Sequence, residues 1–367
     1  MSTDYLSSGP SFAEGEVIER IEAFRKRRPR LREELVTLAH GAGGKSSAAL
    51  VDAVFVEAFR NSHLEDLGDG AVLTLPTGER MAFSTDSFVV APRRFPGGSI
   101  GHLAVHGTVN DLACSGAVPQ WLSAAFVLEE GFPIAELKGI VADMAAAAAA
   151  AGVQIVTGDT KVVPRGAADG LFVTTAGVGV IPSGRRLAAA DVRVGDRLIL
   201  SGPMGDHGMA VMLARGDLAI EADISSDTAA ISDLVEHLLA AAPATRWLRD
   251  PTRGGVGTVC NELAQATGLG VVLDELELPV RPVVNGACEM LGIDPLYVAN
   301  EGRFLAVVGP DEVDAGLAAM RAHPLGGEAV VVGEITEQPG STVVLRTAFG
   351  GTRIVDMLVG DPLPRIC

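Results

Sequence analysis

The feature that most constrains the fold of this chain is a break near its middle. Pro182-Ser183-Gly184 separates two halves, and in each half short strand-like runs alternate with segments of helical spacing. At 367 residues the chain is too long for one hydrophobic core, so two domains are expected. A composition of 48% hydrophobic and 20% charged residues is typical of a compact α/β protein.

We therefore predict an α/β (α+β) fold with an N-terminal domain over 36–182 and a C-terminal domain over 183–350. Residues 1–35 form an extension with a basic cluster, which fits a solvated helix or tail better than a docking arm. Residues 351–367 are predicted to be a mobile tail, because the two prolines near its end favour an extended chain that cannot join a sheet interior.

The hydrophobic pattern also predicts individual elements. In the first half we expect a short strand or extended lead over 35–38, strands over 71–75, 81–85, 154–157 and 171–181, and helices over 47–60, from about 100 onward and around 145–151. In the second half we expect strands over 197–201, 270–273, 303–308 and 329–335, and helices over 208–215, 227–242 and 255–266.

Charge and cysteine usage exclude several classes of protein. The net charge of −17 repels phosphate backbones, which argues against nucleic-acid binding. No apolar stretch of about 18 residues runs without a charge, and the N-terminus lacks an apolar signal-peptide core, so no membrane span or export is expected. Four cysteines without a CxxC pair fit free thiols in a reducing compartment. The chain is predicted to be cytoplasmic.

Four segments with acidic or amide side chains are expected in glycine-bearing turns of the first half. They are Gly68–Ala71, Ser84–Ser87, Val109–Leu112 and Thr157–Lys161. Hard oxygen ligands spread over several loops are how proteins hold Mg²⁺ together with nucleotide phosphates. Each segment alone also fits an ordinary turn, but together they favour a nucleotide site, where Lys161 would offset phosphate charge.

A glycine loop, His40–Ser46, opens a predicted helix. Free backbone N–H groups at a helix start bind anions, so the loop is either a phosphate cradle or a simple helix entry. It is not a Walker A motif, because GxxxxGK[ST] is not satisfied.

The second half offers three further polar residues. Arg253 lies on a turn before a helix, and Glu301 lies just before a predicted strand, which is a common place for an acid or base. His207 is either part of a third loop at the site or a loop histidine satisfied by the backbone.

Cys367 is the last residue of the sequence. A structural thiol is normally buried within an element, whereas a thiol on a tail is exposed and modifiable. Nearby Arg365 would favour its thiolate. A lipid anchor and a redox thiol are the alternatives, but prenylation needs the cysteine four residues from the end.

In these residues the chain resembles the HypE family of hydrogenase maturation factors. The resemblance covers residues from about 36 onward. Eight segments carry it: His40–Gly44, Ser84–Asp86, Asn110–Leu112, Val156–Val163, Gly205–Gly208, Thr252–Val256, Ala299–Gly302 and the ending Pro364-Arg365-Ile366-Cys367. The acidic segments are shared with the wider superfamily of aminoimidazole-ribonucleotide synthetase relatives, and the ending is specific to HypE.

The resemblance implies a two-domain aminoimidazole-ribonucleotide synthetase-like fold. In a homodimer, the mixed sheets of the N-terminal domains would pair into a barrel, with ATP bound in a cleft nearby. It also implies an ATP-dependent carbamoyl dehydratase, a lyase that converts an S-carbamoyl group on Cys367 to a thiocyanate. HypF would supply the carbamoyl group, and the HypC–HypD complex would receive cyanide for the iron of [NiFe]-hydrogenase.

Site residues follow from the same resemblance. The metal positions for Mg²⁺ would be Asp69, Asp86, Asp111 and Asp159. The phosphates of ATP would meet His40, Gly43, Gly44, Asn110, Thr157, Gly158 and Thr160.

The catalytic residues would be Cys367, Lys161, Glu301 and Arg253. The carbamoyl oxygen attacks the γ-phosphate, so that phosphate becomes the leaving group in place of hydroxide. Lys161 and Mg²⁺ would stabilise the transferring group, Arg253 would orient phosphate oxygens, and Glu301 would take the N–H proton.

Two rival functions stay open at this point. Selenophosphate synthetase and thiamine-phosphate kinase belong to the same superfamily, but neither explains a terminal cysteine. A non-enzymatic carrier would ferry a group on Cys367 without consuming a nucleotide, and an ATP hydrolysis assay separates it from an enzyme.

Overall fold

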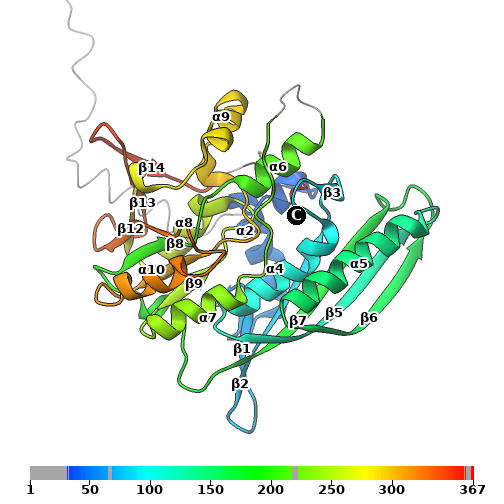
Figure 1. The fold of residues 1–367 in the computed structure, drawn as a ribbon, viewed down its shortest axis with the longest axis horizontal. Helices are drawn as coiled ribbons and strands as arrows, with labels where there is room; N and C mark the ends of the chain where they lie inside the picture. Colours follow the sequence, from blue (N-terminus) through cyan, green and yellow to red (C-terminus); the bar gives the residue numbers. More distant parts are fainter. Residues whose placement is uncertain (1–30, 32, 65–67, 217–221, 359, 361–364) are drawn as a thin grey trace, which may run out of the picture.

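A computed structural model of the chain describes residues 31, 33–64, 68–216, 222–358, 360 and 365–367. The basic cluster of the predicted extension, at residues 25–28, 30 and 32, lies outside the described residues. Two sheets with their helices lie beside each other in Figure 1. Within the described ranges, no helix is both long and apolar enough to cross a membrane.

The N-terminal half forms a five-stranded sheet in the order β1-β2-β7-β5-β6. Its strands are β1 (Ala71–Thr74), β2 (Arg80–Phe88), β5 (Val118–Glu129), β6 (Gln154–Val163) and β7 (Leu171–Ile181). β5 and β6 run parallel, whereas the other neighbours are antiparallel, so the sheet is mixed. A small hairpin of β3 (Arg94–Phe95) and β4 (Gly98–Ser99) follows β2 in the chain.

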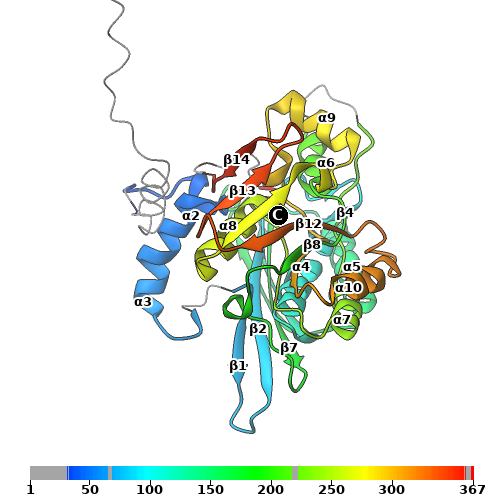
Figure 2. The same ribbon diagram turned by 90° about the vertical axis from the view of Figure 1, so that its left-hand side faces the viewer.

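In the part of the chain that the structure describes, helices cover one face of this sheet and leave the other uncovered (Figures 1 and 2). They are α4 (Ile100–Cys114) and α5 (Ile134–Ala150). Burial alternates strictly along β7, because successive side chains of a strand point to opposite faces. The face away from the helices is open and exposes large apolar side chains, among them Phe83, Trp121, Val127 and Val180.

The C-terminal half forms a seven-stranded sheet in the order β14-β13-β10-β12-β8-β11-β9. The strands are β8 (Arg197–Leu200), β9 (Trp247–Arg249), β10 (Gly270–Asp274), β11 (Leu305–Val308), β12 (Val330–Thr336), β13 (Val343–Arg346) and β14 (Thr352–Val355). The last strand lies within the range 351–367 that the sequence assigns to a tail. Only β10 and β13 pair in parallel among the strands described.

Both faces of the second sheet are covered. Leu198 and Leu200 pack against α8 (Gly255–Thr267), while Ile199 between them packs with α7 (Ser232–Ala241) and α10 (Val313–Arg321). Strands buried on both faces read as continuous apolar runs, as in β11.

A third cluster joins the two halves. It includes side chains of α4, α5 and β7, of α6 (Asp206–Ala214) and α9 (Pro282–Leu291), and Ile366 from the end of the chain. Ile366 is only 1% exposed, so the end of the chain is packed into this core.

Most predicted elements are present, and two differ in detail from the expectation. Residues 35–38 form no strand, but Thr37 is extended and leads into a 3-10 helix over Leu38–Gly41, which is capped by reciprocal bonds between Thr37 and His40. The helix expected over 47–60 is present as α2 (Lys45–Leu50), a π-helical turn over Val51–Val56 and α3 (Glu57–Phe59).

The acidic segments do not all lie in turns, so the prediction that placed all four in glycine-bearing turns is corrected. Gly68–Gly70 precedes β1, but Ser84–Ser87 lies within β2, Asn110 and Asp111 lie within α4, and Thr157–Lys161 lies within β6. Gly158 is required there by close approach and not by a turn, because a Cβ atom would lie 2.1 Å from the Ala124 carbonyl oxygen.

Leu103→Ala is expected to destabilise the N-terminal half by about 2–5 kcal/mol, because its fully buried side chain on α4 would leave a cavity. The urea unfolding midpoint measures the change. The same substitution at Leu276, which is 75% exposed, should stay within about 0.5 kcal/mol. Equal midpoints for the two variants would contradict the assigned core.

Candidate active site

Carboxylates from four separate segments meet between the two halves of the chain. Asp69 precedes β1, Asp86 lies on β2, Asp111 on α4, and Asp250 follows β9. The side chains of Asp86 and Asp111 are hydrogen-bonded to each other. Oxygens of Asp69 and Asp250 and the sulfur of Cys114 all lie within 4.8 Å of one another. We call these four aspartates the carboxylate cluster.

Burial controls the protonation of the carboxylate cluster. It raises the pKa of Asp69, Asp86 and Asp111, and it raises the pKa of Asp250 to about 7. Neighbouring carboxylates add to the effect at Asp111, where Asp86 is the largest of them. The Arg249 guanidinium opposes it at Asp69, with Nε 2.6 Å from Oδ1. The cluster therefore holds protons or needs a cation.

The glycine loop and Arg253 lie against each other. Arg253 Nη1 donates to the Gly41 carbonyl oxygen at 2.5 Å. Gly43 has a φ of +75°, and a Cβ atom there would lie 2.8 Å from the Arg253 carbonyl oxygen. Only glycine fits this approach. The loop predicted to cradle phosphate is thus packed on the arginine predicted to orient it.

Glu301 is buried beside this arginine. Its Oε1 atom has no hydrogen-bond partner among the described residues. Burial is the main cause that raises the pKa of Glu301 well above its usual range, with Asp250, Asp227 and Asp86 adding to it and Arg253 opposing. A buried, unpaired carboxyl of this kind is suited to hold or take a proton.

Cys367 reaches the same place from the end of the chain. Its thiol is hydrogen-bonded to Arg253, and the residue as a whole is 7% exposed. Burial raises the pKa of Cys367 to about 12, Arg253 lowers it, and Glu301 raises it. Arg365, expected to favour the thiolate, instead forms an ion pair with Asp169. The arginine chosen from the sequence was therefore wrong, because Arg365 has a φ of +55° and this bend in the backbone turns its side chain away from the Cys367 thiol.

The residues of β6 that were predicted to bind ATP and metal lie away from the carboxylate cluster. Asp86 is level with Thr175, Ala124 and Gly158 on successive strands, which puts β6 three strand spacings, or roughly 14 Å, from Asp86. Asp159 and Lys161 are exposed, form an ion pair with each other, and point to the open face of the sheet. Lys161 is the main cause that lowers the pKa of Asp159.

Neighbouring Thr157, Gly158 and Thr160 share that edge strand and are also exposed. A single copy of the chain therefore does not bring the β6 residues to the carboxylate cluster.

Two residues predicted to bind phosphate already have hydrogen-bond partners. Asn110 Nδ2 donates to the carbonyl oxygens of Ala229 and Glu301, and Oδ1 accepts the Ile231 N–H. His40 Nδ1 accepts the Thr37 N–H at 2.9 Å. Gly44 contacts Leu358 so closely that a Cβ atom would lie 2.2 Å from its carbonyl oxygen.

Sequence reasoning did not choose Asp250 or Asp227. Asp250 adjoins the Pro251-Thr252-Arg253 turn, and this position was the signal that could have revealed it. Asp227 accepts the N–H groups of Glu301 and Gly302 at 3.1 and 3.2 Å. Nothing in its local sequence indicates that role.

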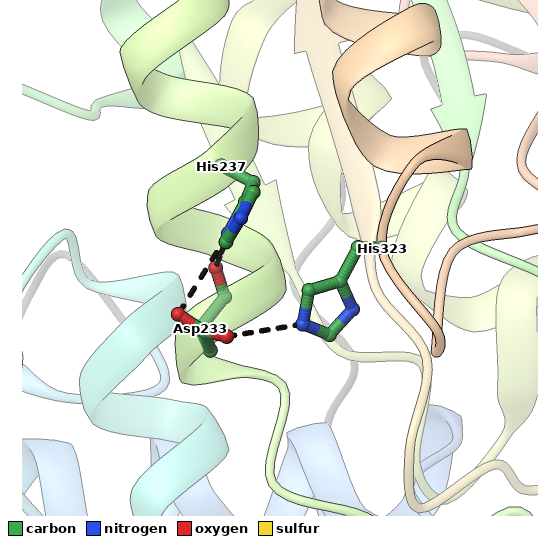
Figure 3. A group of neighbouring side chains, drawn as sticks. All are labelled: Asp233, His237 and His323. Carbon is green, nitrogen blue, oxygen red and sulfur yellow. Dashed lines mark hydrogen bonds and ion pairs between the residues drawn. The ribbon is translucent and has the colours of Figure 1, made fainter.

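A separate group of possible metal ligands lies on the surface (Figure 3). Asp233 and His237 on α7 and His323 after α10 point toward one another. His323 Nδ1 accepts the Leu325 N–H at 3.1 Å, so its proton is on Nε2 and is donated to Asp233 Oδ2 at 3.1 Å. A metal at Nε2 would force that proton onto Nδ1, against the Leu325 N–H. The bonds instead join α7 to the segment after α10.

This combination of fold and site defines a class. The family described as AIR synthase related protein, N-terminal domain, matches residues 67–181, and the family described as AIR synthase related protein, C-terminal domain, matches residues 193–346. The chain is therefore a two-domain AIR synthase related protein, which confirms the predicted fold class.

More specific relatives narrow the class. Carbamoyl dehydratase HypE of Rhodobacter capsulatus is 58% identical over 92% of this chain and 99% of its own length. HypE in a HypE–HypF complex has a TM-score of 0.80 and 45% identity, covering 84% of this chain and 100% of that one. HypE in complex with ATP has a TM-score of 0.76 and 43% identity, covering 91% and 100%. The chain belongs to the HypE family, as the resemblance of its motifs indicated.

A more distant structure has the same fold. Thiamine monophosphate kinase of Aquifex aeolicus has a TM-score of 0.61 at 16% identity, covering 84% of this chain and 97% of that chain. This likeness concerns the fold alone.

Asp111→Asn is expected to raise the melting temperature of protein freed of divalent cations, and to raise it more at about pH 8 than at about pH 5. The raised pKa means that the folded state binds this proton more tightly than the unfolded chain. Stability is therefore lost as pH rises from the ordinary carboxyl range toward the raised pKa, and asparagine removes that loss. Scanning fluorimetry measures it, at roughly 2–4 °C per kcal/mol.

The matched control for this measurement is Asp311→Asn, at an exposed position. It should change the melting temperature little, and equally at both pH values. A pH-independent shift in Asp111→Asn would show that burial does not govern the cluster.

Proposed function

We propose that the chain dehydrates a carbamoyl group carried on the sulfur of its own Cys367, giving a thiocyanate. As a member of the HypE family, it is an ATP-dependent enzyme of hydrogenase maturation, a carbamoyl dehydratase. The supporting observation is the position of Cys367. Its buried thiol is hydrogen-bonded to Arg253 and lies close enough to Glu301 for that carboxyl group to raise the pKa of the thiol.

The chemistry requires an oxygen to leave as something better than hydroxide. The carbamoyl oxygen attacks the γ-phosphorus of ATP, one amide proton is lost, and ADP departs. The C–O bond then breaks, phosphate leaves with that oxygen, and the second N–H proton goes to a base as the C≡N bond forms. Glu301 is the candidate base, because its unpaired carboxyl oxygen is buried in the same site as the sulfur.

Arg253 would hold the transferring phosphate near the sulfur. Its side chain already contacts both the glycine loop and Cys367. A guanidinium presents several donors in a fixed plane, which suits phosphate oxygens. His40, Gly43 and Gly44 line the same loop and stay candidates for phosphate binding.

The carboxylate cluster fits a divalent cation. It is buried, its members repel one another, and the nearby Arg249 is paired with Asp69 and Glu262. We propose that Asp69, Asp86 and Asp111 hold Mg²⁺, which would neutralise phosphate charge during transfer. Asp250 would join them as a fourth carboxylate.

A second copy of the chain would complete the site. Among the described residues β6 is an edge strand with one side of its backbone unpaired, and the open face beside it exposes Trp121 and Val127. Pairing two such sheets into a barrel would cover this face. The partner's β6 would then bring Asp159, Lys161 and Thr157 to the ATP bound by this chain, which explains why they lie apart from the cluster here.

Other parts of the proposal concern partners and location. HypF is the partner of the related HypE in a solved complex, and we propose that it carbamoylates Cys367 here. We propose that cyanide then passes to the HypC–HypD complex, and that the work takes place in the cytoplasm.

Glu301→Gln is expected to slow dehydration by about 10²–10⁴-fold while carbamoyl acceptance stays intact. Intact-mass spectrometry with HypF, a carbamoyl donor and ATP follows both steps, as gain of a carbamoyl group and then loss of water. The parent rate should rise with pH, because the base must ionise through its raised pKa, and the variant should lose this dependence.

The control for this experiment is Glu289→Gln, an exposed carboxyl on α9 that should keep the parent rate. Phosphate release without any loss of water, or water loss without ATP, would contradict the proposed reaction.

Mixing two inactive variants tests the shared site. Lys161→Ala and Glu301→Gln should each be inactive alone. If Lys161 acts across the dimer, random mixed dimers regain about a quarter of parental activity when one intact site forms in each heterodimer. If Lys161 and Glu301 act within one chain, each chain of the heterodimer lacks one of the two residues. No intact site can then form, so activity stays absent.

The control is the same mixture before subunit exchange, which should stay inactive under either arrangement. Activity that rises with exchange time supports the shared site, and activity that never rises removes Lys161 from the partner's ATP.

A further inference from the structure

One buried carboxylate is bound by three consecutive residues of the segment that carries Glu301. Asp227, in the loop before α7, accepts the Glu301 N–H at Oδ1 and the Gly302 N–H at Oδ2, at 3.1 and 3.2 Å. Nε of Arg303 lies 3.6 Å from the same Oδ2. The Asp227 side chain has no exposed surface, so residues 301–303 fold around a carboxylate that water does not reach.

Two glycines allow the close packing around this carboxylate. A Cβ atom on Gly302 would lie 1.9 Å from the Asp227 carbonyl oxygen, so the two main chains touch at this point. A Cβ atom on Gly202 would lie 3.1 Å from Cζ of Arg303, so the guanidinium lies against the main chain of the loop after β8. A side chain at either glycine would therefore displace the segment that carries Glu301.

Arg303 is fixed by main-chain oxygens of separate segments. Nε donates to the Pro203 carbonyl oxygen at 3.1 Å, and Nη1 donates to those of Gly302 and Leu325 at 3.4 and 3.3 Å. A guanidinium presents its donors in a rigid plane, so these bonds set the orientation of the group as well as the place of its charge. Burial raises the pKa of Asp227 and the Arg303 guanidinium opposes the shift, which favours the charged form that accepts both N–H groups.

The main chain of Glu301 is also held at its carbonyl group. The oxygen accepts Nδ2 of Asn110 and the N–H of Ala229, both at 3.3 Å. The side chain differs, because its Oε1 atom has no hydrogen-bond partner among the described residues. Main-chain contacts therefore supply much of the positioning of this carboxyl group, and Asp227 accounts for those on the N–H side.

We propose that Asp227 and Arg303 are positioning residues, which hold the main chain of Glu301 so that its carboxyl group reaches the carbamoyl group on Cys367. The proposal rests on the function given above, because it needs Glu301 as the base. Both residues act through Glu301 and touch neither ATP nor the reacting atoms. A misplacement of about 1 Å can cost about 10²-fold in rate, so their loss affects dehydration and spares ATP binding and carbamoyl acceptance.

Asp227→Asn is expected to slow dehydration of the carbamoylated protein by about 10–100-fold. An asparagine keeps one accepting oxygen, but its NH₂ group meets the second N–H with another donor, so that N–H loses its partner. Intact-mass spectrometry follows the loss of water, and the KM for ATP and the rate of carbamoyl acceptance should stay within about twofold of the parent. A raised KM for ATP with an unchanged dehydration rate overturns the proposal.

Arg303→Lys is the conservative companion variant, and it decides the question should Asp227→Asn fail to fold. Lysine keeps the positive charge beside Asp227 but loses the planar group that holds the carbonyl oxygens of Pro203 and Leu325. Dehydration should slow by about tenfold, again with the KM for ATP unchanged. A parent rate in folded Arg303→Lys would remove Arg303 from the proposal.

The matched control is Asp196→Asn. Asp196 is another buried aspartate, whose Oδ2 accepts the Arg193 N–H at 2.7 Å and lies 2.6 Å from Nε of Arg246. It precedes β8, whereas Glu301 precedes β11, and because these strands are antiparallel the two residues lie at opposite ends of the pair. Asp196→Asn should lower the melting temperature in scanning fluorimetry and keep the parent dehydration rate. Equal slowing in Asp196→Asn and Asp227→Asn overturns the proposal.

A double variant shows whether Asp227 acts through Glu301. In Glu301→Gln the base is already lost, so adding Asp227→Asn should change the remaining dehydration rate by less than about twofold. If Asp227 only stabilises the fold, it slows the reaction by the same factor in both backgrounds, which overturns the positioning role and leaves the proposed function standing. A parent rate in Glu301→Gln alone would overturn the proposed function, and this inference with it.

Discussion

The buried amide of Asn110 joins the two halves of the chain, and the position of the site depends on it. Its donors hold the carbonyl oxygens of Ala229 and Glu301, and its acceptor holds the N–H of Ile231, with no exposed surface. A buried polar group without partners costs about 1–3 kcal/mol, so this arrangement is strongly specified. The next residue, Asp111, belongs to the carboxylate cluster. One turn of α4 therefore fixes both the cluster and the backbone of the candidate base.

Glu301 is held from its other side as well. Asp227 accepts the N–H groups of Glu301 and Gly302, and burial raises the pKa of Asp227 while the Arg303 guanidinium opposes the shift. With the backbone fixed from two directions, the carboxyl group of Glu301 keeps its place even though its Oε1 has no partner among the described residues. Preorganisation of this kind avoids reorganisation during the reaction. The unpaired oxygen is tolerated because the backbone around it is so well bonded.

Sequence patterns revealed the alternation of elements but not their roles in space. β5, a central strand of the first sheet, was missed because Pro119 and Gln120 interrupt its apolar pattern, and the structure accommodates them with a register shift. Asp86 and Glu301 lie close enough to interact electrostatically, although nothing in the local sequence links β2 to a loop more than two hundred residues away. Conversely, Asp159 and Asp86 look equivalent in sequence but lie on opposite faces of one sheet. Side-chain direction on a strand depends on register, which a single sequence does not reveal.

The docked thiol has a consequence for the order of the chemistry. Burial that raises the pKa of Cys367 to about 12 leaves the docked sulfur protonated near neutrality, and a protonated sulfur is a poor nucleophile. Under the proposed function, acceptance of a carbamoyl group would therefore belong to a tail that has left this site, where an exposed thiol ionises near its usual pKa of about 8.5. Dehydration makes no such demand, because the sulfur is then already bonded to carbon and only oxygen and nitrogen change partners. The burial that keeps the free thiol protonated would also exclude water from a thiocyanate formed there, so under the proposed reaction the buried site favours dehydration and disfavours acceptance of the carbamoyl group.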